Sequence, residues 1–159
     1  MEKKYIIIPN CSDLNRGDQA LVWETKRIAE DAGYIGRYYV TIEDKEPVQQ
    51  SINHGLNPIS MVLKHPSRFY KHNDNINYSL SLKIKWGFVA LGDLILSSLI
   101  LNSFARRFIT PFLNKDIKYS LRIFKESDAL FIKGGGFIHF YGGLTALYYA
   151  YFSLYHVFL

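Results

Sequence analysis

The stretch Lys4-Tyr5-Ile6-Ile7-Ile8 is a continuous apolar run, without alternation between apolar and polar residues. Such a run is typical of a strand buried on both faces of a parallel sheet. A polar loop follows it, and residues 17–32 have the pattern of an amphipathic helix. Its apolar face carries Leu21, Thr25, Ile28 and Ala32, with Ala29 beside them. Strand, loop and helix make the first half of a βαβ unit.

Further elements of the same kind follow along the chain. Residues 37–42 and 129–132 are predicted strands, and residues 115–126 form a predicted helix. Residues 47–76 are rich in Pro, Asn and His, which predicts an irregular connection with one short helix. A last apolar helix is predicted to begin at Gly142-Gly143. The fold class is therefore α/β, a Rossmann-like parallel sheet with flanking helices, as one domain over residues 1–159.

Residues 78–112 are predicted to form a helical, basic and apolar insertion in this domain. Their apolar core, residues 86–101, is interrupted by Asp93 and two glycines and is shorter than a membrane-spanning helix. The core is flanked by basic residues, as in a helix that lies in a membrane interface. These residues are Lys83, Lys85, Arg106 and Arg107. A buried core helix with basic residues snorkelling at its ends is the alternative.

The net charge of +5 is concentrated in the middle of the chain. Residues 64–125 carry a net charge of +8, whereas residues 1–63 carry −2 and residues 126–159 carry −1. This distribution predicts a local patch that faces an anionic partner. No nucleic-acid recognition motif accompanies the patch, so nucleic acid is not the expected partner.

Cysteine usage and the first residues bear on the compartment. Cys11 is the only cysteine, so the chain can form neither an internal disulfide nor a thiolate metal cluster. This usage fits a reducing compartment. The opening Met1-Glu2-Lys3-Lys4 and the short apolar run behind it lack the pattern of a signal peptide. We expect a cytoplasmic protein.

A first candidate site is the loop Asn15-Arg16-Gly17-Asp18-Gln19-Ala20, which follows a strand and opens a helix. In a parallel sheet this position lies at the carboxyl edge, where ligands bind. Gly17 permits a tight turn and a close approach of a ligand, and Asn15 can tie the loop. Asp18 either caps the helix or contacts a ligand. A pure capping role predicts that Asp18→Asn leaves stability nearly unchanged.

The second candidate site is Gly134-Gly135-Gly136, which comes directly after the last predicted strand. Backbone N–H groups of such a run can cradle an anion, although no Gly-Lys-Ser/Thr follows as in a Walker loop. His139 lies close behind and either contacts the ligand or is a structural residue. We expect this run to lie at the carboxyl end of a central strand, beside the Asn15–Asp18 loop.

Together, two segments resemble the two motifs of the polysaccharide pyruvyl transferase family: the loop Asn15-Arg16-Gly17-Asp18-Gln19-Ala20 and the segment Ser127-Asp128-Ala129-Leu130-Phe131-Ile132-Lys133-Gly134-Gly135-Gly136. The resemblance implies the N-terminal half of a two-domain enzyme similar to GT-B glycosyltransferases. This family transfers pyruvate from phosphoenolpyruvate, as a ketal, to a sugar of a cell-surface glycan. No metal or organic cofactor is implied.

This resemblance gives the candidate residues their roles. We expect Asp18 to act on a sugar hydroxyl as the catalytic residue. Substrate-binding residues are expected to be Asn15, Arg16, Gly17, Gly134, Gly135, Gly136 and His139. The basic groups that hold phosphoenolpyruvate belong to the second half of the family's fold, so we expect this chain alone to be inactive, with a C-terminal domain missing. The alternative is a non-catalytic domain that binds peripherally at the inner face of a membrane.

Overall fold

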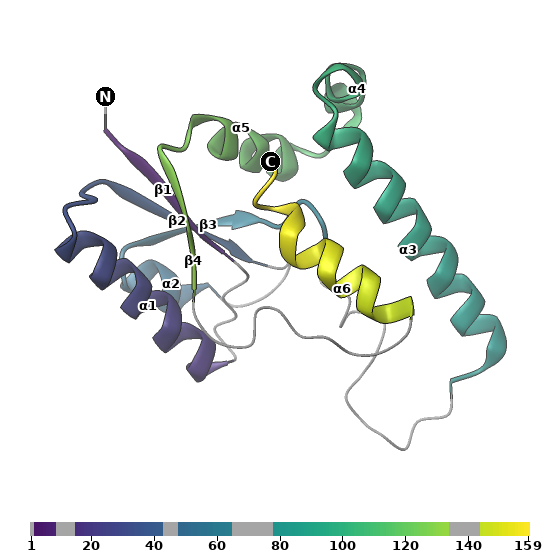
Figure 1. Cartoon of the computed structure of the whole chain (residues 1–159), viewed down its shortest axis with the longest axis horizontal. Helices are drawn as coiled ribbons and strands as arrows, with labels where there is room; N and C mark the ends of the chain where they lie inside the picture. Colours follow the sequence, from purple (N-terminus) through teal and green to yellow (C-terminus); the bar gives the residue numbers. More distant parts are fainter. Residues whose placement is uncertain (1, 9–14, 43–47, 65–77, 134–143) are drawn as a thin grey trace.

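The computed structural model describes residues 2–8, 15–42, 48–64, 78–133 and 144–159 of the chain, which form a parallel sheet with helices on both faces (Figure 1). Along the chain, the elements are β1 (Lys4–Ile8), α1 (Arg16–Asp31), β2 (Arg37–Ile42), α2 (Gln49–Asn53), β3 (Leu56–Ser60), α3 (Leu80–Leu101), α4 (Ser103–Ile109), the 3₁₀ helix η2 (Thr110–Phe112), α5 (Lys115–Glu126), β4 (Ala129–Ile132) and α6 (Leu144–Tyr155).

The four described strands are all parallel and follow the order β3-β2-β1-β4. In the register, Ile6 of β1 lies opposite Tyr39 of β2 on one side and Leu130 of β4 on the other. This is the order of the first four strands in the doubly wound α/β fold. The predicted α/β class and its parallel sheet are confirmed. The expectation that β4 is central is wrong for the described sheet, because β4 is its outer strand.

The strand β3 lies in the segment that the sequence predicted to be irregular, and only the short helix expected there is confirmed, as α2. Pro58 sits in the middle of β3, opposite Val40. Proline is tolerated there because β3 is an edge strand and has no second neighbour among the described residues that needs its N–H group. The Asn57 amide also donates a hydrogen bond to the Tyr38 carbonyl at 2.8 Å, which ties β3 to β2.

Helices α1 and α5 cover opposite faces of the sheet because successive residues of β1 point to opposite sides. Tyr5 and Ile7 face α1, whereas Ile6 and Ile8 face α5. The core on the α1 side is rich in aromatic rings, with centroid separations between 5.2 and 6.3 Å. These rings belong to Tyr5, Tyr34, Tyr38 and Phe131.

The face that α1 buries differs from the predicted one except at Ala29, which was expected beside that face and is buried. Val22 and Ala29 are buried against the sheet, whereas Leu21 and Ile28 are exposed. The sheet presents the large rings of Tyr5 and Tyr38 to this helix, and small side chains pack over them at close range. The helix is therefore rotated away from the face that carries its larger aliphatic residues.

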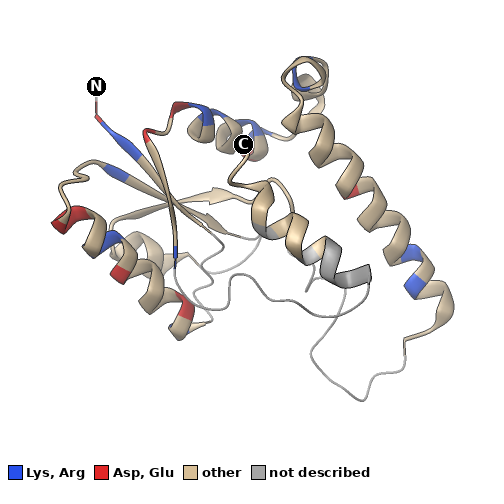
Figure 2. Ribbon diagram, in the orientation of Figure 1, with Lys and Arg blue, Asp and Glu red and all other residues tan. Residues whose placement is uncertain are grey.

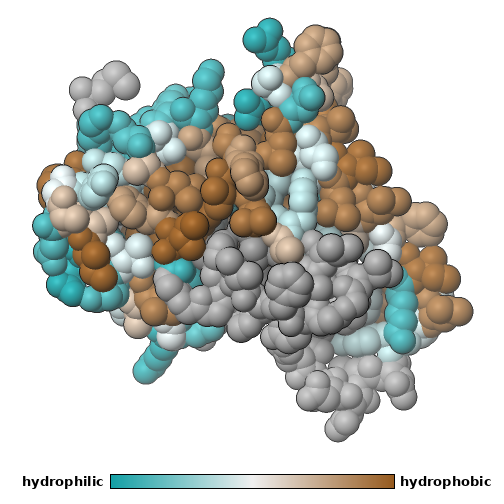
Figure 3. All heavy atoms as spheres, viewed as in Figure 1, coloured by the Kyte–Doolittle hydropathy of each residue, from teal (hydrophilic) through white to brown (hydrophobic). Residues whose placement is uncertain are grey.

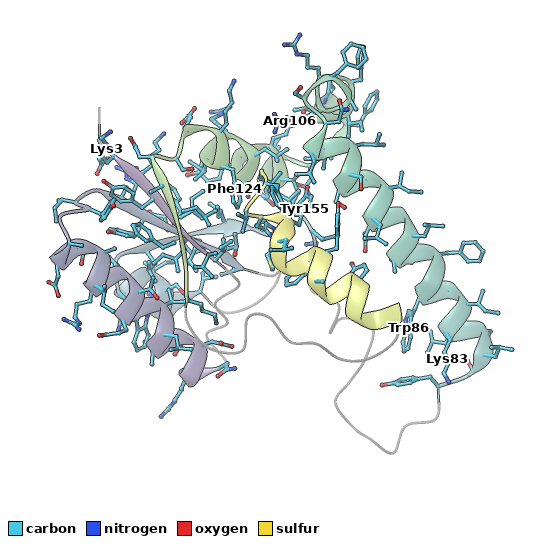
Figure 4. All side chains as sticks on the ribbon, viewed as in Figure 1. Lys3, Lys83, Trp86, Arg106, Phe124 and Tyr155 are labelled. Atoms are coloured by element: carbon cyan, nitrogen blue, oxygen red, sulfur yellow. The ribbon has the colours of Figure 1, made fainter. Side chains whose placement is uncertain are left out.

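The helix α6 lies beside α5, and α3 runs along the outer side of the molecule (Figure 4). Two buried residues of α6, Phe152 and Tyr155, pack on Met61 and Leu63 beyond the end of β3. The helix α3 contacts α6 through the Ser97 hydroxyl, which lies 2.9 Å from the Tyr151 hydroxyl. Near its C-terminal end, α3 also buries Ile100 against α5.

Candidate functional site

The carboxyl ends of β1 and β4 lie side by side, on the edge of the sheet where the order of strands reverses. The Lys133 N–H group donates a hydrogen bond to the Ile8 carbonyl at 2.8 Å, which fixes the chain just after β4 beside the end of β1. Open α/β sheets bind ligands in the crevice at this position. The geometry therefore places any residue that follows β1 or β4 near a natural ligand site.

At this edge, Asp18 and Lys133 form an ion pair between Oδ1 and Nζ, although they are 115 positions apart in the sequence. Asp18 lies in the first turn of α1, and Lys133 is the residue after β4. The structure thus joins the first candidate motif to the strand of the second motif. Lys133 belongs to that motif, but the sequence pattern did not predict it as a site residue. The sequence signal that could have identified it was a lysine between an apolar strand and a glycine run.

Asn15 is the residue that caps α1. Its side-chain oxygen accepts hydrogen bonds from the N–H groups of Gly17 at 3.1 Å and Asp18 at 3.3 Å. The Asn15 amide group donates to Asp18 Oδ2 at 2.7 Å. The possibility that Asp18 itself caps the helix is therefore wrong, because the preceding Asn15 has taken that role. Asp18 is free of capping and is held in one orientation.

The two side chains of the ion pair differ in how far they are exposed to solvent. The Lys133 side chain is 6% exposed, whereas the Asp18 side chain is 37% exposed. A buried ammonium group is costly unless a counter-charge compensates it, and Asp18 supplies that charge. Asp18 also lies in the first turn of α1, at the N-terminal end of the helix. Asp18 is thus a fixed carboxylate, and a molecule in solvent can still reach it.

Arg16 and Gly17 lie at ordinary helical positions in the first turn of α1. Gly17 lies inside the first turn of α1 and does not have the positive φ found at Gly33 and Gly55. A Cβ atom added at Gly17 would meet only Asn15 Oδ1, at an ordinary contact distance of 3.4 Å. A tight turn therefore does not require glycine here, which corrects that part of the prediction. Arg16 is exposed in the same turn.

The other predicted site residues lie outside the described part of the chain. These are Gly134, Gly135, Gly136 and His139. Their expected place beside the Asn15–Asp18 loop stays a prediction. Lys133, directly before the glycine run, is the last residue that the structure describes on this side.

The beginning of the second motif is at the opposite, amino edge of the sheet. The Asp128 carboxylate accepts hydrogen bonds from the Lys3 ammonium group at 2.5 Å and from the Lys4 N–H group at 2.9 Å. The hydrogen bond from Lys3 is the largest cause that lowers the pKa of Asp128 below its usual value. A second ion pair joins Lys4 and Glu126 at 2.5 Å. These contacts hold β1 to β4, so this part of the motif is architectural.

Within the described residues, no group of three or more His, Cys, Asp and Glu side chains is arranged to hold a metal ion. Comparisons of the chain with family models, curated proteins and solved structures gave no match. The fold and the site define the chain as an α/β protein with a parallel sheet and a lysine-paired aspartate at its carboxyl edge. The resemblance to a family rests on the two sequence motifs.

Proposed function

We propose that this chain is the N-terminal, acceptor-side part of a polysaccharide pyruvyl transferase-like enzyme. In this proposal, the enzyme transfers pyruvate from phosphoenolpyruvate to a cell-surface glycan. The observation that carries the proposal is the Asp18–Lys133 pair, which joins the regions of the two family-like motifs at the ligand-binding edge of the sheet. Each motif alone resembles a common kind of loop. The Asp18–Lys133 ion pair brings one residue of each motif together at the same edge of the sheet.

The chemistry needs a group that receives a proton from a sugar hydroxyl. Two hydroxyls of one sugar add to C2 of phosphoenolpyruvate, and the bond from C2 to the phosphate oxygen breaks. One hydroxyl proton ends on the methylene carbon, which becomes the methyl group of the ketal, and the other leaves with phosphate. A positioned general base and cationic groups for the phosphate and carboxylate are the requirements.

Asp18 suits the role of the base because its carboxylate is paired with Lys133, oriented by Asn15 and open to solvent on its remaining surface. Lys133 is a positioning residue in this scheme because it is nearly buried and acts through Asp18. Arg16, exposed in the same turn, and the three glycines and His139 behind Lys133 supply further contacts to the substrate. A second Rossmann-like half supplies the cationic groups that hold phosphoenolpyruvate.

The test is a transfer assay that combines the full-length protein with phosphoenolpyruvate. The acceptors are glycans from the surface of the cells that make the protein. Phosphate release and the ketal carbon signal in ¹³C NMR report the reaction. We expect Asp18→Asn to lower turnover by about 10²-fold, the scale for a lost general base. Asp31→Asn, on an exposed carboxylate at the other end of α1, is the matched control. Wild-type turnover in folded Asp18→Asn protein would remove the base role, and absence of ketal with every acceptor would remove the proposed activity.

A further inference from the structure

A second surface, distant in the fold from the Asp18–Lys133 pair, is formed by α3 and α4 and is strongly apolar. Six apolar residues of α3 recur three or four positions apart, which places them on one stripe of the helix. They are Leu80, Ile84, Phe88, Leu91, Ile95 and Leu99, and all are exposed. Figure 3 shows hydrophobic side chains along the side of the molecule that α3 forms. Continuous exposed apolar patches of this kind mark interaction sites.

The stripe continues past the end of α3. Phe104 and Phe108 of α4 are exposed and stack edge to face, with 5.1 Å between ring centroids. Phe112 of η2 is 90% exposed. Three aromatic rings thus extend the aliphatic stripe, which we call the α3–α4 apolar surface. A surface of large aliphatic and aromatic side chains suits insertion into the acyl chains beneath lipid headgroups.

The opposite side of α3 faces the protein. Its buried residues are Ser97 and Ile100, and Ser97 bonds to Tyr151 of α6. Asp93, which in the sequence interrupts the apolar core, is half-buried and falls on this side, two positions away from both Leu91 and Ile95. The acidic residue is therefore off the exposed stripe and does not oppose its insertion into lipid.

Basic residues stand at both ends of the α3–α4 apolar surface. Lys83 and Lys85 lie in the first turns of α3, and Arg106 and Arg107 lie on α4 (Figure 2). Residues 78–112 carry four basic side chains and one acidic one. A helix of 22 residues rises about 33 Å, so the two basic pairs are widely separated along the surface. This charge distribution is complementary to an anionic lipid surface that lies under the whole length of α3.

We infer that the α3–α4 apolar surface docks the protein peripherally on an anionic phospholipid bilayer, with α3 in the plane of the interface. By length and composition, α3 is also the one helix in the described residues that can cross a membrane. In-plane docking agrees better with the structure because α3 keeps its contacts with α5 and α6 and its basic residues stay at headgroup level. A spanning α3 would have to give up Ser97–Tyr151 and the Ile100 contacts.

The experiment is flotation of the protein with vesicles of phosphatidylcholine, with and without phosphatidylglycerol. We expect binding only to the anionic vesicles, and release of the protein at high salt. Lys83→Gln/Lys85→Gln should weaken binding by about tenfold or more, since each basic residue near the surface contributes about fivefold. Phe88→Ser/Phe104→Ser should also weaken it at least about tenfold through lost apolar insertion.

The matched control is Ile35→Ser, because Ile35 is 68% exposed, like Phe88 at 72%, but lies between α1 and β2. It should bind as the wild type does. All variants change exposed residues, so we expect them to fold normally. Unchanged midpoints of urea unfolding will confirm this. No flotation, or equal binding by the Phe88→Ser/Phe104→Ser variant, would overturn the inference. Retention in cell membranes after alkaline carbonate washing would show a spanning α3, and a salt-resistant dimer without vesicle binding would show a second copy as the occupant. Either result also overturns it.

Discussion

The Asp18–Lys133 pair predicts a specific cost for Asp18→Asn. If Asp18 only capped the helix, the substitution would leave the free energy of unfolding nearly unchanged. In the structure, however, the Asp18 carboxylate compensates the charge of the buried Lys133. Removing one partner of a fully buried pair costs about 3–5 kcal/mol. Because Asp18 is 37% exposed, water screens part of this interaction, and we expect a loss of about 1–3 kcal/mol.

Urea unfolding of a double-mutant cycle measures this effect. A loss of about 2 kcal/mol moves the urea midpoint by about 1 M when the slope is about 2 kcal/mol per molar. Lys133→Met removes the buried charge, so Asp18→Asn should cost far less in the Lys133→Met background. The surface variant Asp31→Asn, whose partner Arg27 is exposed, should cost about 0.5 kcal/mol or less. If Asp18→Asn changes stability by no more than Asp31→Asn, or the two site substitutions are additive, the account of a buried, compensated lysine is refuted.

Four further outcomes follow from single side chains. Asn15→Ala should destabilise the protein by about 1 kcal/mol in urea unfolding, since it removes the α1 cap, and Asn15→Asp should restore most of that loss. Gly17→Ala should keep or raise stability by up to about 1 kcal/mol, because the added Cβ has room inside a helix. Gly36→Ala should lower the melting temperature, because its Cβ would lie 2.5 Å from the carbonyl oxygen of Lys3; an unchanged value would contradict this packing. Burial lowers the pKa of His156 from 6.5 to about 4, so the unfolded chain binds a proton in this window that the native chain does not, and about 3 kcal/mol of stability should be lost as the pH falls from 6.5 to 4. His156→Phe should flatten the pH profile of unfolding in that window, and an unchanged slope would show that other groups cause it.

Strands with a strong local signal could be predicted from the sequence. β1 and β4 are mainly continuous apolar runs, β2 is rich in β-branched and aromatic residues, and the structure confirms the bounds of all three. β3 could not be predicted, because Asn57 and Pro58 lack strand propensity and the pairing with β2 supplies the order. The burial of α1 also depends on partners, since the tyrosine rings of the sheet select Val22 and Ala29 as contacts.

The site could be predicted only in part, because one of its residues is brought in from a distant part of the sequence. The positions of Asn15 and Asp18 follow from a polar loop between a strand and a helix. The role of Lys133 depends on the parallel pairing of β1 and β4, which brings two distant segments together. The helix expected within residues 78–112 is confirmed, but the interpretation that its apolar segment is too short to span a membrane was wrong, because α3 is long and apolar enough by length and composition. Ser79 accepts a hydrogen bond from the Leu82 N–H group at 3.3 Å, so the helix begins at Leu80 and continues through the two lysines.

The central claim is that the carboxyl edge beside Asp18 and Lys133 binds the acceptor sugar. The most direct test is a titration of the ¹⁵N-labelled protein with methyl hexopyranosides, followed through backbone amide shifts. We predict shifts at Gly17, Asp18 and Lys133 with at least one of the sugars, and their loss in Asp18→Asn protein that is still folded. No shift with any of the sugars, or shifts confined to α3 and other elements away from this edge, would contradict the claim.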